Sequence, residues 1–178
     1  MPRGNRHQLP GYVWHLTSRC HRQRFLLKFA RDRRDWVSWL FEARKRFGLC
    51  VLDYQVTCNH IHLVVIDRGN GEVGRSMQLV EGCIARAYNR RKDRRGSFWE
   101  DCYHATAVDS EGHLANCLVY VDLNMVRAGV VDHPSRWRWA GYHEIQQPRD
   151  RYRIVDRTVL CELLGVDESR LARVHRDW

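Results

Sequence analysis

The stretch that decides the fold of this chain lies between residues 58 and 66 and reads Cys58-Asn59-His60-Ile61-His62-Leu63-Val64-Val65-Ile66. Its second half is apolar and rich in β-branched residues, which is typical of a buried strand. Side chains alternate between the two faces of a strand, so His60 and His62 point to the same side of the sheet. The stretch therefore predicts a strand over residues 60–66 that displays two neighbouring imidazoles.

Such a histidine pair has two interpretations. It can be one surface residue and one hydrogen-bonded sheet residue, or two ligands of a metal ion that acts on phosphodiesters. The charge of the chain favours the metal-ligand interpretation, because its 178 residues carry a formal net charge of +9. Most of the positive charge comes from arginine, since lysine occurs only at Lys28, Lys45 and Lys92. Arginine binds phosphate bidentately and stacks on bases, so this composition fits nucleic acid better than a general solubility charge.

The patterns around the histidine strand predict an ordered series of elements. Strands are expected over residues 12–18, 49–56, 60–66 and 97–108, and helices over residues 32–47, 73–89 and 113–128. The order β-α-β-β-α-β-α is the split βαβ arrangement of ferredoxin-like folds with an added helix. The predicted fold class is therefore α+β, with a central antiparallel sheet that carries His-x-His on one strand.

The cysteine pattern and the N-terminus bear on the compartment. Seven cysteines are scattered without a Cys-x-x-Cys pair, and no apolar segment follows the basic N-terminus. These features argue against a disulfide framework, a zinc knuckle and a secretion signal. We expect a reduced, cytoplasmic protein with no membrane partner, because no apolar run approaches membrane-spanning length.

The helix expected over residues 113–128 carries two adjacent stripes at helical spacing. The apolar stripe contains Leu114, Leu118, Val121 and Met125. The polar stripe contains His113, Cys117, Tyr120, Asn124 and Arg127. The polar stripe can be the solvated shoulder of an amphipathic helix, or a surface on which a phenol, an amide and a guanidinium act together.

Strand and helix together resemble the single-tyrosine HUH transposases, and within them the REP-associated tyrosine transposases. Residues 59–63, Asn-His-Ile-His-Leu, match the His-hydrophobe-His motif, and residues 120–129, Tyr-Val-Asp-Leu-Asn-Met-Val-Arg-Ala-Gly, resemble the tyrosine helix of that family. The resemblance spans residues 10–143. One departure is Met125, where the family usually has a proline, and this change is expected to remove an irregularity of the helix.

The resemblance implies an activity. A domain over residues 1–143 would cleave and rejoin single-stranded DNA at hairpin-flanked, REP-like sites through a 5′-phosphotyrosine, and residues 144–178 would form a tail with short helices near 158–164 and 168–176. Tyr120, on the added helix, would be the catalytic nucleophile, and Tyr88 is the second candidate.

The resemblance also implies a metal site, and the basic clusters of the sequence offer a surface for DNA. His60, His62 and Asn124 would hold Mg²⁺ or Mn²⁺, and the ligand types alone would not exclude Zn²⁺. The expected partner is single-stranded or hairpin DNA, bound by a monomer or a homodimer in the nucleoid. The residues expected to contact DNA, each of which could equally be a solvated charge, are Arg19, Arg86, Arg90, Arg91, Arg94, Arg95 and Arg127.

Two other functions stay open from the sequence. A ferredoxin-like sheet can serve as a non-catalytic nucleic-acid-binding module that stacks on single strands, although no RNP1-like stretch occurs here. A metal-dependent phosphoesterase for small molecules would need carboxylates, and only Asp53 and Asp67 lie near the histidine pair in the sequence. A covalent link between protein and DNA would separate these alternatives from the transposase.

Overall fold

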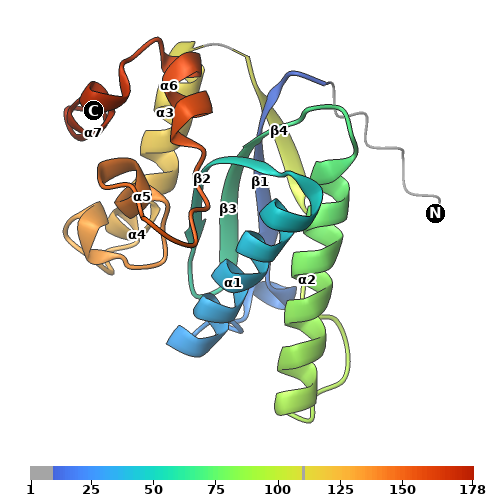
Figure 1. The fold of residues 1–178 in the computed structure, drawn as a ribbon. Helices are drawn as coiled ribbons and strands as arrows, with labels where there is room; N and C mark the ends of the chain where they lie inside the picture. Colours follow the sequence, from blue (N-terminus) through green and yellow to red (C-terminus); the bar gives the residue numbers. More distant parts are fainter. Residues whose placement is uncertain (1–9, 110) are drawn as a thin grey trace.

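The computed structural model describes residues 10–109 and 111–178, which fold around one antiparallel sheet (Figure 1). Its four strands lie in the order β2-β3-β1-β4. Their bounds are Val13–Arg19 for β1, Cys50–Val56 for β2, His60–Ile66 for β3 and His104–Val108 for β4. Strand β3 lies between β1 and β2 and is antiparallel to both, so the predicted ferredoxin-like α+β fold is confirmed.

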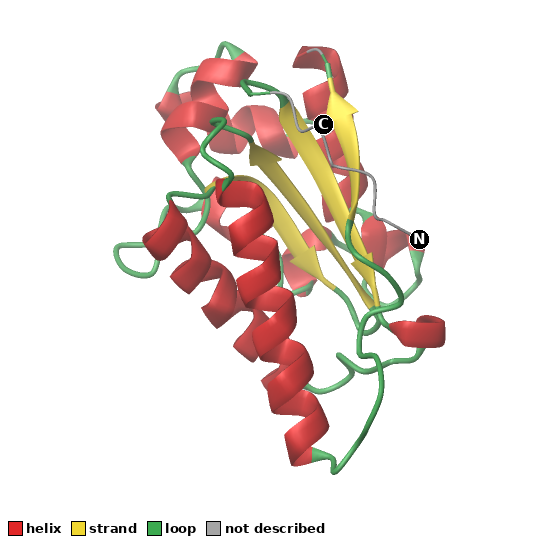
Figure 2. Ribbon diagram, turned by 90° about the vertical axis from the view of Figure 1, so that its right-hand side faces the viewer, coloured by secondary structure: helices red, strands yellow, loops and turns green. Residues whose placement is uncertain are grey.

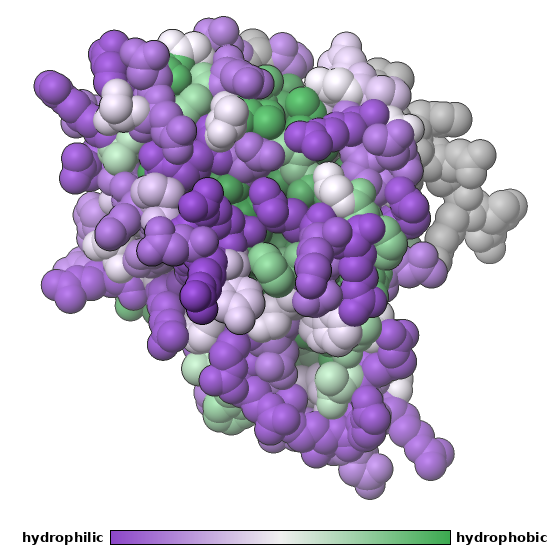
Figure 3. Space-filling model, in the orientation of Figure 1, coloured by the Kyte–Doolittle hydropathy of each residue, from purple (hydrophilic) through white to green (hydrophobic). Residues whose placement is uncertain are grey.

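Helices cover both faces of the sheet. Helices α1 (Ala30–Phe47) and α2 (Glu72–Arg91) lie side by side on one face, and α3 (Glu111–Asp122) lies on the other (Figures 1 and 2). The face with α1 and α2 is largely hydrophilic on its outside (Figure 3). The remaining helices are α4 (Asn124–Arg127), α5 (Tyr142–Gln146), α6 (Arg157–Leu164) and α7 (Glu168–Arg176), and the two 3-10 turns are η1 (His21–Gln23) and η2 (Pro134–Arg136). None of the helices described is long and apolar enough to cross a membrane.

The core follows the periodicity of the sequence. Helix α1 buries Trp36, Leu40 and Ala43, which are spaced at three and four residues and so lie on one side of the helix. Helix α2 buries Met77 and Val80 in the same way. Strand β3 is apolar on both faces beyond the histidines, because helices cover the sheet on both sides.

The strand predicted over residues 97–108 is shorter than expected. Only His104–Val108 is a strand, and residues 97–103 form an irregular segment. Phe98 in this segment is 2% exposed and packs edge-on against Tyr88, while the Asp101 carboxylate accepts a hydrogen bond from the Cys102 amide. These apolar residues therefore belong to a packed loop, where burial does not require alternation.

The helix predicted over residues 113–128 is broken at Leu123, between α3 and α4. Met125 does not restore a continuous helix, so that expectation was wrong. The Gln55 side chain of β2 donates a hydrogen bond to the Asp122 carbonyl at 3.2 Å. In an unbroken helix that carbonyl would accept from Val126, and a side chain that takes its place bends the helix.

The C-terminal residues cover the open edge of the sheet. Val155 forms a bridge to Val51 of β2, and the Asp156 amide donates to the Val51 carbonyl at 2.7 Å. Helices α6 and α7 follow, and each buries a leucine, Leu160 and Leu171. An uncovered edge strand invites pairing with another chain, so this contact protects β2.

Candidate active site

The register of the sheet builds one polar row beside the histidine pair. Strand β1 pairs with β3 so that Arg19 lies opposite His60 and Thr17 lies opposite His62. Strand β4 continues the row, because His104 lies opposite Thr17. Directly paired residues point to the same face of a sheet. The two imidazoles therefore share their face with a guanidinium and a hydroxyl from β1.

His60 is held by the turn that precedes its strand. Its Nδ1 lies 2.8 Å from the Asn59 side-chain oxygen and 3.0 Å from the Thr57 hydroxyl. The Thr57 hydroxyl in turn donates to the His60 carbonyl at 2.8 Å. A proton on Nδ1 satisfies the Asn59 oxygen and leaves the Nε2 lone pair of His60 directed away from the turn.

His62 is the more buried histidine, at 4% exposure. Its Nε2 lies 3.2 Å from the amide nitrogen of Asn124, and its Nδ1 lies 2.9 Å from Nε2 of His15 on β1. The His60 and His62 rings are nearly perpendicular, with centroids 4.9 Å apart. Asn124 therefore reaches the histidine pair from α4, on the far side of the helix break.

Tyr120, in the last turn of α3, faces the same group of side chains. Its ring centroid lies 5.6 Å from that of His62 and 5.9 Å from that of His15, in both cases edge to face. The Arg127 guanidinium lies over the ring, 5.1 Å from its centroid. Tyr120 is 44% exposed, so a large substrate can reach its hydroxyl.

The structure thus brings together four residues that were selected from the sequence: His60, His62, Tyr120 and Asn124. They come from β3, α3 and α4 and are separated by about sixty positions in the chain. The break at Leu123 lies between the phenol and the amide. Both side chains lie at the histidines, Tyr120 before the break and Asn124 directly after it.

Both strand histidines are neutral near pH 7. Burial lowers the pKa of His62 to about 3, and the nearby charges of His60, His15 and Arg19 act in the same direction. Burial, followed by the charge of Arg19, also lowers the pKa of His60. A neutral imidazole is the form that binds metal ions, so the lone pairs are available at physiological pH.

The donor set fits a divalent cation. Two ligands on adjacent positions of one metal ion, each at about 2.1 Å, lie about 3 Å apart. The Asn124 amide nitrogen and His62 Nε2 are 3.2 Å apart, and a half-turn of the amide places its oxygen at that point. With His60 Nε2 as the third donor, the set is two imidazoles and one amide oxygen, and Tyr120 stands beside it.

Carboxylates do not complete this site. Among the residues described, no group of three or more His, Cys, Asp or Glu side chains could hold a metal. Asp53 is fully buried beneath the Tyr54 amide, and Asp67 lies beyond the opposite end of β3, where its carboxylate accepts from the Gly69 amide. Asp53 and Asp67 therefore do not supply the carboxylate ligands that a metal-dependent phosphoesterase for small molecules would need beside the histidines.

His15 is the residue that sequence reasoning missed. It lies on β1 in the predicted strand, and alternation alone would have placed it on one face with Thr17 and Arg19. The predicted split βαβ fold already places β1 next to β3, but the sequence does not reveal the register between them, which brings His15 to His62. The signal that could have identified it is a third histidine on a predicted strand, two positions before Thr17 and so on the same face.

The predicted DNA-contacting arginines fall into three groups. Arg19 and Arg127 lie beside the histidines and Tyr120. Arg86, Arg90 and Arg95 are exposed along the end of α2 and the loop after it, although Arg86 also donates to the Cys83 sulfur at 3.3 Å. The remaining two have internal partners, because Arg91 pairs with the buried Asp32 and Arg94 donates to the Asn89 side-chain oxygen and the Ser97 carbonyl.

Tyr88, the second candidate nucleophile, has a packing role. Its ring contacts Phe98 at 5.1 Å between centroids, and the Arg91 guanidinium lies 5.2 Å from it. It belongs to α2, on the sheet face opposite α3. Tyr120 is therefore the tyrosine that lies at the histidine pair.

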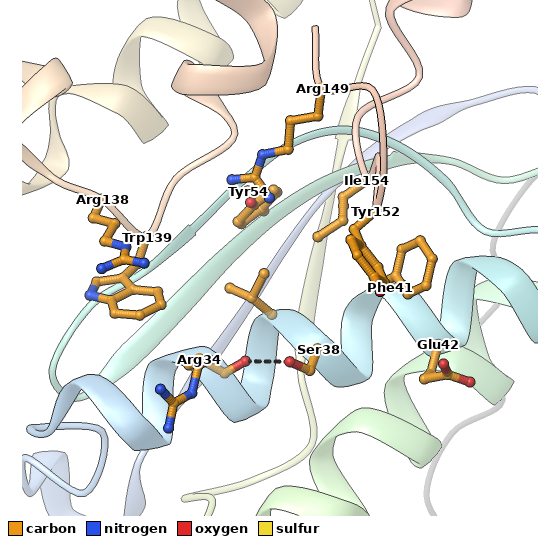
Figure 4. A pocket seen from close by; sticks show the side chains of 11 residues that line it. Arg34, Ser38, Phe41, Glu42, Tyr54, Arg138, Trp139, Arg149, Tyr152 and Ile154 are labelled. Carbon is orange, nitrogen blue, oxygen red and sulfur yellow. Dashed lines mark hydrogen bonds between the residues drawn. The ribbon is translucent and has the colours of Figure 1, made fainter.

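Two of the hollows on the described part of the chain lie against opposite faces of the sheet. The first, of 360 Å³, lies beside the histidine row and is lined by Thr17, Arg19, Glu100, Asp101, Cys102 and His104. The second, of 430 Å³, lies between α1 and the C-terminal segment, with Arg34, Phe41, Tyr54 and Tyr152 among its side chains (Figure 4). Tyr54 points to the face opposite Gln55 and the histidines, so only the first hollow adjoins the candidate site.

Comparison with known proteins places the chain in a family. The sequence profile of the family described as "Transposase IS200 like" matches residues 10–124, a stretch that includes both histidines, Tyr120 and Asn124. The chain belongs to this family of transposases. It is therefore an enzyme, and the non-catalytic binding module is set aside. None of the curated protein sequences compared with the chain matches it.

A solved structure shares the fold of this transposase. The structure of a REP-associated tyrosine transposase bound to a REP hairpin aligns with a TM-score of 0.65 at 16% sequence identity, over 86% of this chain and 90% of the other. The crystal structure of a candidate transposase from Deinococcus radiodurans R1 aligns with a TM-score of 0.46 at 14% identity, over 73% of this chain and 98% of the other.

Proposed function

We propose that this transposase breaks a phosphodiester bond of single-stranded DNA with Tyr120 as the nucleophile. The phenol oxygen attacks the phosphorus atom and the bond from phosphorus to the 3′ oxygen breaks. The DNA is left with a free 3′-hydroxyl, and the 5′-phosphate is joined to the tyrosine. A 3′-hydroxyl can later reverse the step, which rejoins DNA. The convergence of Tyr120 with His60, His62 and Asn124 carries this proposal.

The reaction needs help beyond the phenol itself. An ordinary phenol has a pKa of about 10, so reaching the phenolate at pH 7 costs roughly 4 kcal/mol. The transition state also places extra negative charge on the phosphate. Arg127 beside the Tyr120 ring and Arg19 beside His60 lie where a guanidinium can neutralise such charge. These two arginines would orient the scissile phosphate against the tyrosine.

We further propose that His60, His62 and Asn124 hold Mg²⁺ or Mn²⁺. A bound divalent cation supplies Lewis-acid polarisation of the scissile phosphate. The neutral imidazoles and the 3.2 Å separation between His62 and the Asn124 amide support this ligand set. Imidazole ligands also suit Zn²⁺, so metal identity needs a direct comparison.

The proposed substrate is single-stranded DNA that carries a hairpin. A protein of the same fold is bound to a REP hairpin, which supports this choice. The 360 Å³ hollow next to the histidine row, with Arg19 at its rim, can take a nucleotide that flanks the scissile phosphate. In this scheme residues 1–143 form the catalytic unit and residues 144–178 support it.

The test uses single-stranded oligonucleotides taken from the flanks of the gene, with the hairpin intact and a label at either end. We expect an adduct that survives SDS, forms only with Mg²⁺, Mn²⁺ or Zn²⁺, and retains the 3′-terminal label but not the 5′-terminal label. An adduct that retains the 5′-terminal label would contradict the direction of attack. Cleavage without any adduct would contradict the tyrosine mechanism altogether.

A further inference from the structure

His15 contacts the most buried of the proposed metal ligands. Its Nε2 lies 2.9 Å from His62 Nδ1, and the two rings are stacked with centroids 5.1 Å apart and an angle of 21° between planes. His62 is 4% exposed. The outer nitrogen of a metal-binding histidine is commonly fixed by such a partner, and here the partner is another imidazole.

Two neutral imidazoles at this distance share a single proton. If the proton sits on His62 Nδ1, His15 accepts it and His62 Nε2 keeps a lone pair. If the proton sits on His15 Nε2, His62 Nδ1 accepts and the remaining proton of His62 lies on Nε2. The second arrangement would direct an N–H at the position where a cation is to bind.

The orientation of the Asn124 amide in the structure agrees with the first arrangement. Its amide nitrogen, which can only donate, lies 3.2 Å from His62 Nε2, so in this orientation that nitrogen of His62 accepts. His62 then carries its proton on Nδ1 and donates it to His15. The chain of three side chains runs in one direction, from the Asn124 amide through His62 to His15.

We propose that His15 is a positioning residue that holds His62 in the tautomer protonated on Nδ1. His15 touches neither substrate nor metal, and it acts through the hydrogen bond that it accepts. It also lies under Tyr120, with ring centroids 5.9 Å apart, so one side chain supports both the ligand and the nucleophile. This inference rests on the proposed function only in so far as His62 is a metal ligand.

Three substitutions separate the acceptor from the shape of the ring. His15→Phe keeps a ring to stack on His62 and removes the acceptor, and His15→Leu removes both. His15→Gln restores an acceptor, because its amide oxygen reaches about as far as the imidazole Nε2. Thr106→Val is the matched control: Thr106 pairs with His15 across β1 and β4, and it is exposed.

The first readout is the tautomer of His62 in the metal-free protein, observed by ¹⁵N NMR of the imidazole. We expect protonation at Nδ1 in the wild type, in His15→Gln and in Thr106→Val. In His15→Phe and His15→Leu we expect a mixture that includes the Nε2 form. The second readout is Mn²⁺ affinity by calorimetry, which should fall about 10- to 100-fold in the Phe and Leu variants only.

Several outcomes would overturn the inference. They are an Nε2-protonated His62 in the wild type, an unchanged tautomer and Mn²⁺ affinity in His15→Phe, or a His15→Gln variant that behaves like His15→Phe. If the wild type binds no Mn²⁺, the metal part of the proposed function fails. The NMR readout then still decides whether His15 sets the tautomer, so the two failures are distinguishable.

Discussion

His175 donates a hydrogen bond from Nε2 to the Asp122 carboxylate at 2.7 Å, and this contact ties the last helix of the chain to the segment that carries Tyr120 and Asn124. Both side chains are buried, and Gln146 completes the group by donating to His175 Nδ1 at 2.7 Å. Asp122 stands midway between the nucleophile and the proposed amide ligand. The C-terminal helix therefore fixes the part of the chain where α3 breaks.

Replacing His175 should loosen this segment. His175→Ala leaves the buried Asp122 carboxylate and Gln146 amide without a partner, which should lower the free energy of unfolding by about 1–3 kcal/mol. We expect adduct formation to slow while DNA affinity stays the same. Urea unfolding and single-turnover cleavage measure the two effects. Arg173→Ala on the same helix is the control, because its side chain is 82% exposed. Equal effects of both substitutions would contradict the role of the contact.

Replacing Tyr120 by phenylalanine should abolish the covalent adduct and leave folding and DNA affinity intact. Only the hydroxyl is removed, and the ring can still stack against His62 and Arg127. Tyr88→Phe is the matched control and should retain full adduct formation, because Tyr88 packs on Phe98. The measurement is the fraction of protein that runs with labelled DNA in SDS. A persistent adduct in Tyr120→Phe would show that another residue attacks.

The sequence predicted the fold in those places where local pattern and burial agree. Strand β3 begins and ends at the predicted residues, because its apolar run is short and rich in β-branched residues, which favours a buried strand over a helix. The strand predicted over residues 97–108 was too long, since Phe98 and Trp99 are apolar for loop packing and not for pairing. Apolar character alone does not distinguish these two cases.

The sequence identified which residues belong to the candidate site, but not the contacts that bring them together. Tyr120 and Asn124 were chosen from helical spacing, yet they meet the histidines at a break that Gln55 causes from a different strand. The contact of His15 with His62 depends on the register between β1 and β3, which a single sequence does not specify. The helix break and the His15 contact both depend on contacts between segments that are far apart in the sequence. Local periodicity therefore could not predict them.

Acid should destabilise the metal-free protein through His62. Its pKa of about 3 lies below the value of 6.5 for the unfolded chain, so only the unfolded state takes up a proton as the pH falls through 6.5. Stability from this residue is fully present above pH 6.5 and declines towards pH 3, at about 1.4 kcal/mol per pH unit, or about 2 kcal/mol at pH 5. Urea unfolding in EDTA at pH 7 and pH 5 measures this decline. His62→Gln should show a clearly smaller decline, and an equal one would contradict the assignment.

Removing any of the proposed metal ligands should slow formation of the covalent adduct. His60→Ala and His62→Ala should each reduce adduct formation on the order of 100-fold or more, because charge stabilisation worth several kcal/mol is removed. Asn124→Ala should have a smaller effect, since a neutral amide oxygen is the weakest ligand of the three. EDTA should reproduce the histidine variants in the wild type. Full activity in EDTA would refute the metal site and leave both histidines with a structural role.

The exposed arginines at the end of α2 provide the last prediction, which concerns the path of the DNA. Arg86, Arg90 and Arg95 are exposed, and the side-chain contact from Arg86 to the Cys83 sulfur is local to α2, so replacing all three by glutamine should change stability little. If they bind the DNA backbone, affinity for every single-stranded DNA should fall alike. The slope of log affinity against log salt should become shallower, by up to about 0.7 for each phosphate that an arginine no longer neutralises.

Arg91→Gln is the informative contrast, because the substitution leaves the buried Asp32 carboxylate without its partner. This variant should lose stability, with less change in the salt slope than the triple variant. Cleavage at saturating DNA should be nearly unchanged in the triple variant, since none of its residues touches the Tyr120 site. An unchanged slope in the triple variant would place the DNA on the opposite face of the sheet. Arg19 and Arg127 lie there beside the histidines, and Arg19→Gln should then flatten the slope instead.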